Sequence, residues 1–351
     1  MPLYKVALIP GDGIGKEVLP EAVNILEKVG RKHDIQFKWH EFSWSCETYA
    51  KTGRMMPEDG IDQLALFDSI FLGAVGYPGV ADHISLWGLL IPIRRAFKQY
   101  VNLRPIKLMK GIVCPLANRT PNEIDFVIVR ENNEGEYSEM GGRIYTGTDR
   151  EMVIQESVFT RQGVDKVLQF AFEQAQKRRN LVTSATKSNG IIHTMPFWDE
   201  RFNVVKNKYP EVNTDQFHID ILCAHFVQHP NWFDVVVGSN LFGDILSDLG
   251  AAVAGGIGLA PAANINPEKE FPSMFEPVHG SAPDIAGKSI ANPIAQIWTG
   301  AMMLDHLGHE YAAKAITDAI ELVVADGNHL TPDLGGSATT QQLGRSIEDA
   351  L

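Results

Sequence analysis

The sequence predicts an α/β protein, and three observations indicate this class. Short apolar runs of strand length alternate with longer segments whose apolar residues recur three or four positions apart. This alternation is typical of βαβ units, in which helices cover a largely parallel sheet. The composition suits a folded globular protein, since 44% of the residues are hydrophobic and 21% are charged. A chain of 351 residues is also long enough for two domains.

The expected elements follow from these patterns. Strands are expected at 4–9, 69–74, 125–129, 181–186, 217–222 and 233–237. Helices are expected at 18–29, 164–175, 240–250, 294–307 and 311–324. Residues 143–158 have β-branched runs around a polar turn and no helix, which predicts a projecting hairpin. An isolated hairpin is only marginally stable in water, so we expect it to pair with a second subunit.

Charge and cysteine content limit the partners and the compartment. The formal net charge of −12 argues against a nucleic-acid partner. Cys46, Cys114 and Cys223 are odd in number and widely separated, which predicts free thiols in a reducing compartment. The first residues do not resemble a signal peptide, and the longest uncharged run, 249–267, contains four glycines and two prolines. We therefore expect a cytoplasmic protein with no membrane partner.

The stretch 7–17, ALIPGDGIGKE, ends the first expected strand with three glycines. A dinucleotide-binding fingerprint needs its third glycine three positions after the second, whereas Gly11, Gly13 and Gly15 are spaced two apart. Glu41 could supply the acidic residue that such a loop requires after the second strand. A tight turn between strand and helix explains the glycines equally well.

An acidic pair suggests a metal site. Asp244 and Asp248 are four residues apart, so a helix would place both carboxylates on one face, where they repel unless a cation lies between them. Hard oxygen ligands favour Mg²⁺ or Mn²⁺. Two solvated acids are the alternative, but the apolar neighbours favour a metal. Lys187 follows an expected strand, and beside a metal a poorly solvated lysine could be neutral and act as a base, although such lysines are usually exposed.

Basic residues form a further candidate cluster. RRAFKQYVNLRP contains Arg94, Arg95 and Arg104, and VRENNEGEY contains Arg130 and Tyr137. Guanidinium groups that converge on one pocket would suit a substrate with two carboxylates, because each carboxylate can be held bidentately. Taken singly, each arginine would equally suit a surface ion pair.

Together these motifs resemble the β-decarboxylating dehydrogenases, the family of isocitrate, 3-isopropylmalate and tartrate/D-malate dehydrogenases. The resemblance runs nearly end to end through IPGDGIGKE, YVNLRP, VREN, EGEY, SATKSNG, GSNLFGDILSDL, FEPVHGSAPDIAGKSIANP and TPDLGGSATT. It implies an isopropylmalate/isocitrate dehydrogenase-like two-domain α/β fold that is not a Rossmann fold. Residues 1–101 and 257–351 would form a large cofactor-binding domain, and 102–256 a central dimerisation and substrate domain with a protruding β arm at 137–158.

The resemblance also implies a homodimer whose active sites draw on both subunits. The substrate carboxylates would be bound by Arg94, Arg104 and Arg130. The Mg²⁺ or Mn²⁺ ligands would be Asp244, Asp248 and, from the other subunit, Asp220. The catalytic residues would be Lys187, also from the other subunit, which takes the hydroxyl proton, and Tyr137, which protonates the enolate carbon after CO₂ leaves. K⁺ is a further candidate cofactor.

NAD is the nucleotide that the resemblance implies. Asp284 stands where the family's NAD enzymes bind the ribose hydroxyls, and a carboxylate there would repel the 2′-phosphate of NADP. The other cofactor-binding residues would be His279, Gly280, Ala282, Ile285 and Asn292, with Ile14 packing near the nicotinamide. This assignment leaves Glu41 without a ribose role and replaces the phosphate-loop interpretation of the opening glycines.

Positions before Arg94 indicate the substrate. Isocitrate enzymes carry a serine and an asparagine where this chain has Gly88 and Leu90, so isocitrate is disfavoured. Isopropylmalate enzymes resemble the chain at Leu90 and Ile91, but they carry a glutamate at the position of Trp87. An inward indole would fill the space of an isopropyl group, whereas an indole that faces away would only pack its helix.

The function expected is oxidation of small dicarboxylic 2-hydroxy acids. D-malate would give pyruvate and CO₂, and tartrate isomers would give oxaloglycolate or D-glycerate. The alternative substrate is 3-isopropylmalate. A catalytically silent regulatory subunit is a competing class, which the complete set of catalytic and metal-binding residues argues against.

Overall fold

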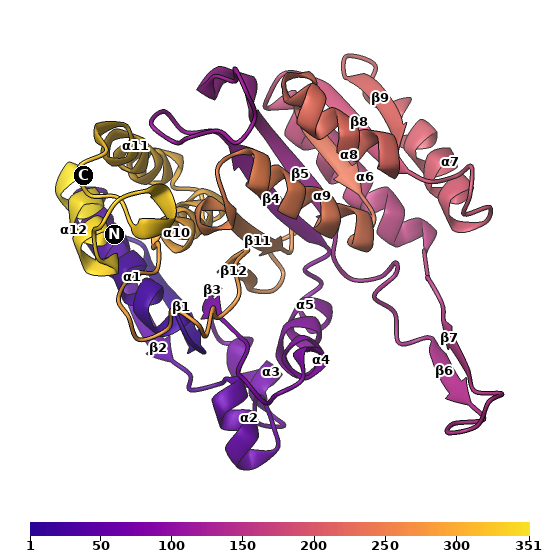
Figure 1. Cartoon of the computed structure of the whole chain (residues 1–351), viewed down its shortest axis with the longest axis horizontal. Helices are drawn as coiled ribbons and strands as arrows, with labels where there is room; N and C mark the ends of the chain where they lie inside the picture. Colours follow the sequence, from indigo (N-terminus) through magenta and orange to yellow (C-terminus); the bar gives the residue numbers. More distant parts are fainter.

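One ten-stranded sheet runs through the whole computed structural model, which describes residues 1–351 (Figure 1). From edge to edge its strands are β2 (Gln36–Glu41), β1 (Leu3–Gly11), β3 (Ser69–Ala74), β12 (Ser273–Pro277), β11 (Pro261–Ile265), β4 (Val101–Lys107), β5 (Asp125–Glu131), β10 (Val235–Gly238), β8 (Leu181–Thr186) and β9 (Asn213–His218). The four strands at each edge are parallel to one another. Strands β11 and β4 join the two blocks through antiparallel pairs.

Helices cover both faces of the sheet. One face carries α1 (Gly15–Lys32), α6 (Arg161–Gln176), α7 (Thr194–Lys206), α10 (Ile294–His306), α11 (Glu310–Asp326) and α12 (Thr340–Ala350), which share one continuous hydrophobic core. The other face carries α2 (Cys46–Thr52), α3 (Gly60–Leu64), α4 (Asp82–Ser85), the π-helical turn η1 (Leu86–Leu90) and α5 (Ile91–Ala96) over one end, and α8 (Ile219–Gln228) and α9 (Asn240–Val253) over the other. Short 3₁₀ turns lie at η2 (Pro121–Glu123), η3 (Pro230–Trp232), η4 (Ile257–Leu259) and η5 (Pro332–Leu334).

The second face has two separate cores, and the gap between them lies over the central strands. On β4 and β5 alternate residues point to opposite faces, as strand geometry requires. Val101 and Val129 enter the continuous core, whereas Asn102, Arg104 and Arg130 lie on the other face. The strand period therefore places a row of polar side chains on the second face, at the gap between its two cores.

Most of the expected elements are present. The strands expected at 69–74 and 181–186 have those bounds, and the helices expected at 164–175 and 311–324 lie within α6 and α11. The hairpin is confirmed, because β6 (Gly141–Ile144) and β7 (Met152–Gln155) pair antiparallel on an arm that projects from the body (Figure 1).

The strand expected at 217–222 is wrong. Strand β9 ends at His218, and Ile219 begins α8. The alternation of polar and apolar residues in FHIDIL imitates a strand, but Leu222 and Phe226 are buried four residues apart, as on one face of a helix. Asp220 consequently lies in the first turn of α8.

The glycine-rich stretch is a close-packed turn. Gly11 and Gly13 have φ of 72° and 51°, and a side chain at either would lie within 2.1 Å of a backbone oxygen. Asp12 between them is fully buried and accepts hydrogen bonds from the backbone N–H groups of Cys46 (2.8 Å), Glu47 (3.0 Å) and Gly76 (3.1 Å). The motif therefore ties the first strand to α2 and to the end of β3.

Three further findings bear on the expectations from sequence. The three cysteines are free, as expected. No helix is long and apolar enough to cross a lipid bilayer. The sheet continues across the boundary suggested at 101/102, which falls at the start of β4, so the division into two domains stays a prediction.

Candidate active site

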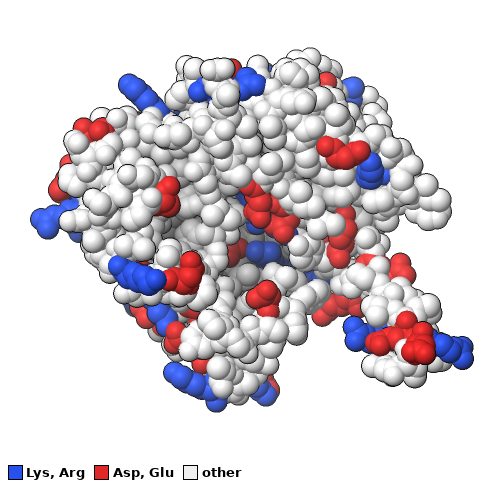
Figure 2. Space-filling model, in the orientation of Figure 1, with Lys and Arg blue, Asp and Glu red and all other residues white.

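A cavity of about 240 Å³ lies over the central strands, between the two cores of the second face. Figure 2 shows a hollow near the middle of the molecule with cationic side chains at its floor and acidic side chains around it. The residues that line the cavity include Leu90, Arg94, Arg104, Arg130, Tyr137, Asp244, Glu276, His279 and Gly280. The structure thus brings together eight residues expected at the site from distant parts of the chain.

Three arginines form the floor. Arg94, Arg104 and Arg130 come from α5, β4 and β5, and each is no more than 7% exposed. Burial lowers the pKa of Arg104, and burial together with the neighbouring Arg104 lowers the pKa of Arg130 to about 10. Three desolvated positive charges in one place create a strong attraction for a di-anionic ligand.

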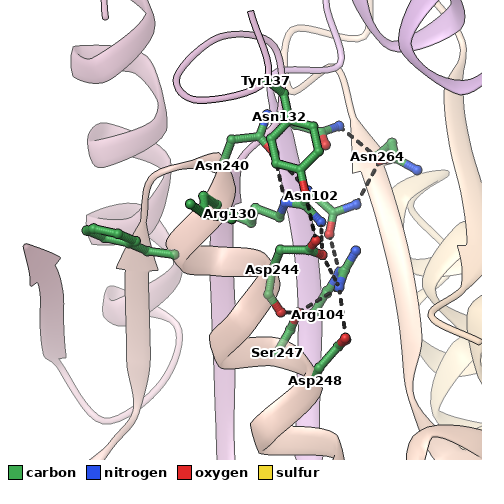
Figure 3. Close-up of polar contacts among 12 residues, drawn as sticks. Asn102, Arg104, Arg130, Asn132, Tyr137, Asn240, Asp244, Ser247, Asp248 and Asn264 are labelled. Carbon is green, nitrogen blue, oxygen red and sulfur yellow. Dashed lines mark hydrogen bonds and ion pairs between the residues drawn. The ribbon is translucent and has the colours of Figure 1, made fainter. Parts of the chain in front are cut away.

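Polar side chains hold these arginines in place (Figure 3). Arg104 donates from Nη1 to Ser247 Oγ at 2.6 Å and to Asp244 Oδ1 at 3.3 Å. Arg130 donates to Asn240 Oδ1 from Nε at 3.1 Å and from Nη2 at 2.7 Å, and its Nη1 also contacts Asp244. The α9 helix therefore supplies counter-charge and acceptors to both β4 and β5.

The acidic pair has the expected helical geometry. Asp244 and Asp248 lie on successive turns of α9, and their side chains are 33% and 60% exposed. Burial acts to raise the pKa of Asp244, but Arg130 and Arg104 outweigh it and the pKa is lowered. For Asp248, burial raises the pKa, against an opposing contribution from Arg104. Two accessible carboxylates on successive turns, of which Asp244 lines the cavity, suit a hard divalent cation.

Tyr137 lies against this pair. Its hydroxyl donates to Asp244 Oδ2 at 3.1 Å, and Arg130 lies over its ring at 5.4 Å from the centroid. Burial and the Asp244 carboxylate raise the pKa of Tyr137. The phenol is therefore kept protonated at neutral pH and can donate a proton to a bound molecule.

Asp220 and Lys187 do not join the cavity of their own chain. Lys187 Nζ lies 2.8 Å from Asp220 Oδ1, and neither residue is among those that line the cavity. No group of three or more histidine, cysteine or acidic side chains within the chain has the arrangement of a metal site. One subunit thus assembles the Asp244/Asp248 pair and leaves the Lys187/Asp220 pair elsewhere.

The residues expected to bind NAD gather beside the cavity. The backbone N–H of Ile14 donates to Ser281 O at 2.9 Å, and Ile14 shares a small apolar cluster with Ala282 and Ile285. Glu17 accepts hydrogen bonds from the backbone N–H groups of Gly287 and Ser289, which closes the loop against α1.

The rest of this group lies on the same loop, with His279 and Asn292 at its two ends. Asp284 is exposed, and Asn292 donates from Nδ2 to Asp333 Oδ2 at 3.0 Å. Burial lowers the pKa of His279, so its ring is neutral at physiological pH, and its buried Nε2 has no hydrogen-bond partner. An unpaired buried nitrogen beside the cavity fits contact with a bound cofactor.

The Trp87 indole does not point into the cavity, where it was expected to fill the space of an isopropyl group. The segment before Arg94 contributes Ser85, Leu86 and Leu90 to the cavity, whereas the Trp87 ring lies beneath Arg95, 5.1 Å from its guanidinium carbon. The π-helical turn at Leu86–Leu90 adds a residue per turn and so changes which side chains face the cavity. The restriction of substrate size by Trp87 therefore stays a prediction, since Trp87 is not among the residues that line the cavity of a single chain.

Sequence reasoning missed several polar residues behind the arginines. They are Asn102, Asn132, Asn240, Ser247, Asn264 and Glu276, all at most 8% exposed. A signal was available for some of them, because Asn264 and Glu276 each interrupt a short, otherwise apolar strand. A buried polar side chain needs a partner, so such an interruption marks a network.

The comparisons with known proteins agree with this geometry. A family model described as isocitrate/isopropylmalate dehydrogenase matches residues 5–347. The chain is 58% identical over 355 residues to the D-malate dehydrogenase (decarboxylating) of Escherichia coli, with 99% of this chain and 98% of that protein covered. It is 57% identical over 357 residues to a tartrate dehydrogenase/decarboxylase of Pseudomonas putida, with the same coverage. The crystal structure of isocitrate dehydrogenase from Methylococcus capsulatus has a TM-score of 0.88 at 35% identity over 99% of both chains.

The chain therefore belongs to the isocitrate/isopropylmalate dehydrogenase family. The family and the isocitrate dehydrogenase-like fold that the motifs implied are both confirmed.

A buried carboxyl group at the end of β5 leads to a prediction about stability. Glu131 is 1% exposed and accepts backbone N–H groups of Asn133 at 2.7 Å and Glu134 at 3.1 Å. Burial raises its pKa to about 8. From about pH 5 to pH 8 the unfolded chain has this group ionised while the folded protein keeps its proton, so the free energy of unfolding should fall as pH rises through this range.

The Glu131→Gln variant should lose less stability across that range, because its amide does not titrate. Urea unfolding at about pH 6 and about pH 8.5 measures both proteins. Glu58→Gln is a matched control, since the Glu58 side chain is 81% exposed. Equal losses in wild type and Glu131→Gln would show that Glu131 does not carry this pH dependence.

Proposed function

We propose that this protein oxidises and β-decarboxylates D-malate to pyruvate and CO₂, and that it also acts on tartrate. NAD is the proposed cofactor, with Mg²⁺ or Mn²⁺ as the proposed metal. The observation that carries the proposal is the convergence of three buried arginines, Asp244 and Tyr137 on one small cavity, with Asp248 one turn further along α9. The names of the E. coli and P. putida relatives support the choice of substrates.

The size and lining of the cavity favour a four-carbon dicarboxylic acid. Its volume of about 240 Å³ lies below the roughly 300–1,000 Å³ of common ligand pockets. The three arginines at the floor can hold two carboxylates, whereas Leu86 and Leu90 offer no polar group for a third carboxylate. The same apolar wall keeps 3-isopropylmalate as the second candidate, because Trp87 lies outside the cavity.

The chain's own residues account for the proton transfers. Lys187, supplied by the second subunit, takes the proton of the 2-hydroxyl group as the hydride is transferred. Tyr137, whose hydroxyl keeps its proton at neutral pH, donates that proton to the substrate carbon after CO₂ has left. A divalent cation held by Asp244, Asp248 and the second subunit's Asp220 would supply stabilisation of negative charge on the substrate oxygens.

The substrate assignment predicts a ranking. With NAD⁺ and Mn²⁺, kcat/KM for D-malate or a tartrate isomer should exceed that for 3-isopropylmalate and isocitrate by about tenfold or more, because the bulkier acids must displace the cavity wall. Parallel measurement of NADH and CO₂ separates oxidation from net decarboxylation of each tartrate isomer. Faster turnover of 3-isopropylmalate than of D-malate would instead support the alternative substrate.

The cofactor assignment is tested at Asp284. Replacement by lysine removes the carboxylate that would repel a 2′-phosphate, so the ratio of kcat/KM for NADP⁺ to that for NAD⁺ should rise about tenfold or more. Asp62→Lys makes the same charge change at an exposed position of α3 and should leave the ratio unchanged. An unchanged ratio in Asp284→Lys would remove the basis for the assignment.

We further infer a homodimer with shared sites, formed from a large domain (1–101 and 257–351) and a central domain (102–256). Exposed apolar side chains support it on the arm, where Met152, Val153 and Ile154 are 47–59% exposed, and on α9, where Ile245 is 46% exposed. Unpartnered apolar faces of this kind are typical of subunit interfaces. The separation of Lys187 from Asp244 gives the second subunit a catalytic role.

Complementation between inactive variants tests the shared site. Lys187→Met and Asp244→Asn should each be inactive, yet their co-expression should restore roughly a quarter of wild-type activity, since half of the dimers would be mixed and each would hold one intact site. Asp244→Asn with Asp248→Asn is the matched control and should restore none, because each site would retain one defect. Absence of recovery in purified mixed dimers would show that Lys187 acts within its own subunit.

A further inference from the structure

Asn264 lies at the centre of the sheet behind the arginines, and its amide group is fully hydrogen-bonded. It is completely buried on β11. Its Oδ1 accepts from Nδ2 of Asn102 at 2.7 Å and from Nδ2 of Asn132 at 2.9 Å. Its Nδ2 donates to Glu276 Oε1 at 2.7 Å and to Met274 O at 3.4 Å. Asparagine supplies two acceptor sites and two donor hydrogens here, and all four are used.

The Asn264 amide connects Arg104 with Arg94, two of the arginines proposed to bind the substrate. On one side, Arg104 donates from Nε to Asn102 Oδ1 at 2.6 Å, and Asn102 donates onward to Asn264 (Figure 3). On the other side, Glu276 Oε1 accepts from Asn264 and from Nη2 of Arg94 at 2.8 Å. One continuous chain of hydrogen bonds therefore runs from Arg104 to Arg94 through Asn264.

The backbone register fixes this arrangement. Asn264 on β11 is opposite Asn102 on β4, and Asn102 is opposite Arg130 on β5. The side chains of such a row lie on the same face of the sheet and are close enough to contact. Because the strands set the spacing, the amide of Asn264 sets the orientation of the groups on either side of it.

Arg94 has an unused donor. Its Nε is buried and has no hydrogen-bond partner, whereas Nη2 is held by Glu276. A buried unpaired donor beside a cavity is costly unless a ligand binds it. The contact with Glu276 thus fixes the Nε/Nη2 edge of the guanidinium group and leaves Nη1, which has no hydrogen-bond partner in the protein, for a substrate carboxylate.

We propose that Asn264 is a positioning residue that sets the relative geometry of Arg94 and Arg104 and thereby determines affinity for the dicarboxylate substrate. This inference rests on the proposed function, in which those two arginines bind the substrate. Asn264 does not touch the substrate. It acts through Asn102 on one side and through Glu276 on the other.

Asn264→Asp gives a result specific to this role. The variant places a second carboxyl group within hydrogen-bonding distance of Glu276, so at low pH the two share one proton and an O–H replaces the lost N–H donor. As pH rises, that proton leaves, the two carboxylates repel, and Arg94 is displaced. KM for D-malate should therefore be near the wild-type value at about pH 6 and about tenfold higher at about pH 8.5, with KM for NAD⁺ changed less than twofold.

Two further variants complete the experiment. Asn264→Leu has no titrating group, so it should raise KM for D-malate by a similar factor at every pH. Asn266→Asp is the matched control, because Asn266 is also fully buried two residues away but bonds to Lys98 O and the 268–271 turn and to neither arginine. It should keep the wild-type KM for D-malate and its pH dependence.

The outcomes separate this inference from the proposed function. If wild-type enzyme turns over D-malate and folded Asn264→Asp keeps its KM at both pH values, the positioning role is wrong. If wild-type enzyme turns over neither D-malate nor tartrate, the proposed function is wrong, whatever the variants do. If the Asn264 variants do not fold, Asn102→Asp replaces them, because it removes the hydrogen bond from Asn102 Nδ2 to Asn264. An unchanged KM for D-malate in that variant overturns the proposal.

Discussion

Burial of three guanidinium groups in one place is the constraint on which the site depends. Positive charges removed from water destabilise a protein unless anions and hydrogen-bond acceptors surround them. Here Asp244 is shared between Arg104 and Arg130, Glu276 pairs with Arg94, and the amide oxygens of Asn102 and Asn240 accept hydrogen bonds from Arg104 and Arg130. The arginines that would attract a dicarboxylate can therefore be buried in the folded protein only because these acidic and amide side chains surround them.

The sheet explains why the cavity lies where it does. Two blocks of parallel strands meet at β11 and β4, and the opposite face is covered by one continuous core. On the cavity face the helices cluster over each block separately, and the cavity lies at the seam between them. The polar side chains of the central strands are buried there, but Arg104 and Arg130 line the cavity and can reach a ligand.

The arm and the Lys187/Asp220 pair have one physical feature in common. Each is satisfied poorly within a single chain: the arm exposes apolar side chains, and the pair lies away from the acids with which its residues would act. The homodimer that we propose would account for both, since the arm would gain a partner and the two halves of the site would meet. This is why we place catalysis between subunits.

Much of the fold and of the site could be predicted from the sequence. Period-two and period-3.6 patterns are local, so they identified β1, β3, β5, β8, β10 and most of the long helices, and the spacing of Asp244 and Asp248 fixed two carboxylates on one helix face. They did not identify β4, β11 and β12, which lie in the middle of the sheet. The long motifs identified the family. The strand predicted at 217–222 was wrong, because a short alternation of polar and apolar residues also occurs at the start of a helix. There Leu222 and Phe226 are buried on one face of α8.

Only the tertiary structure decided which side chains meet. Trp87 lies outside the cavity because a π-helical turn alters the facing of its segment, and no spacing rule shows that in advance. Asn264 connects Arg94 with Arg104 because antiparallel pairing puts β11 beside β4, more than 150 positions away in the chain. The sequence by itself determined the elements, the family and most of the reactive groups, since these depend on neighbours a few residues apart. The positions of those groups relative to one another depend on long-range strand register and helix packing, which a single sequence does not state.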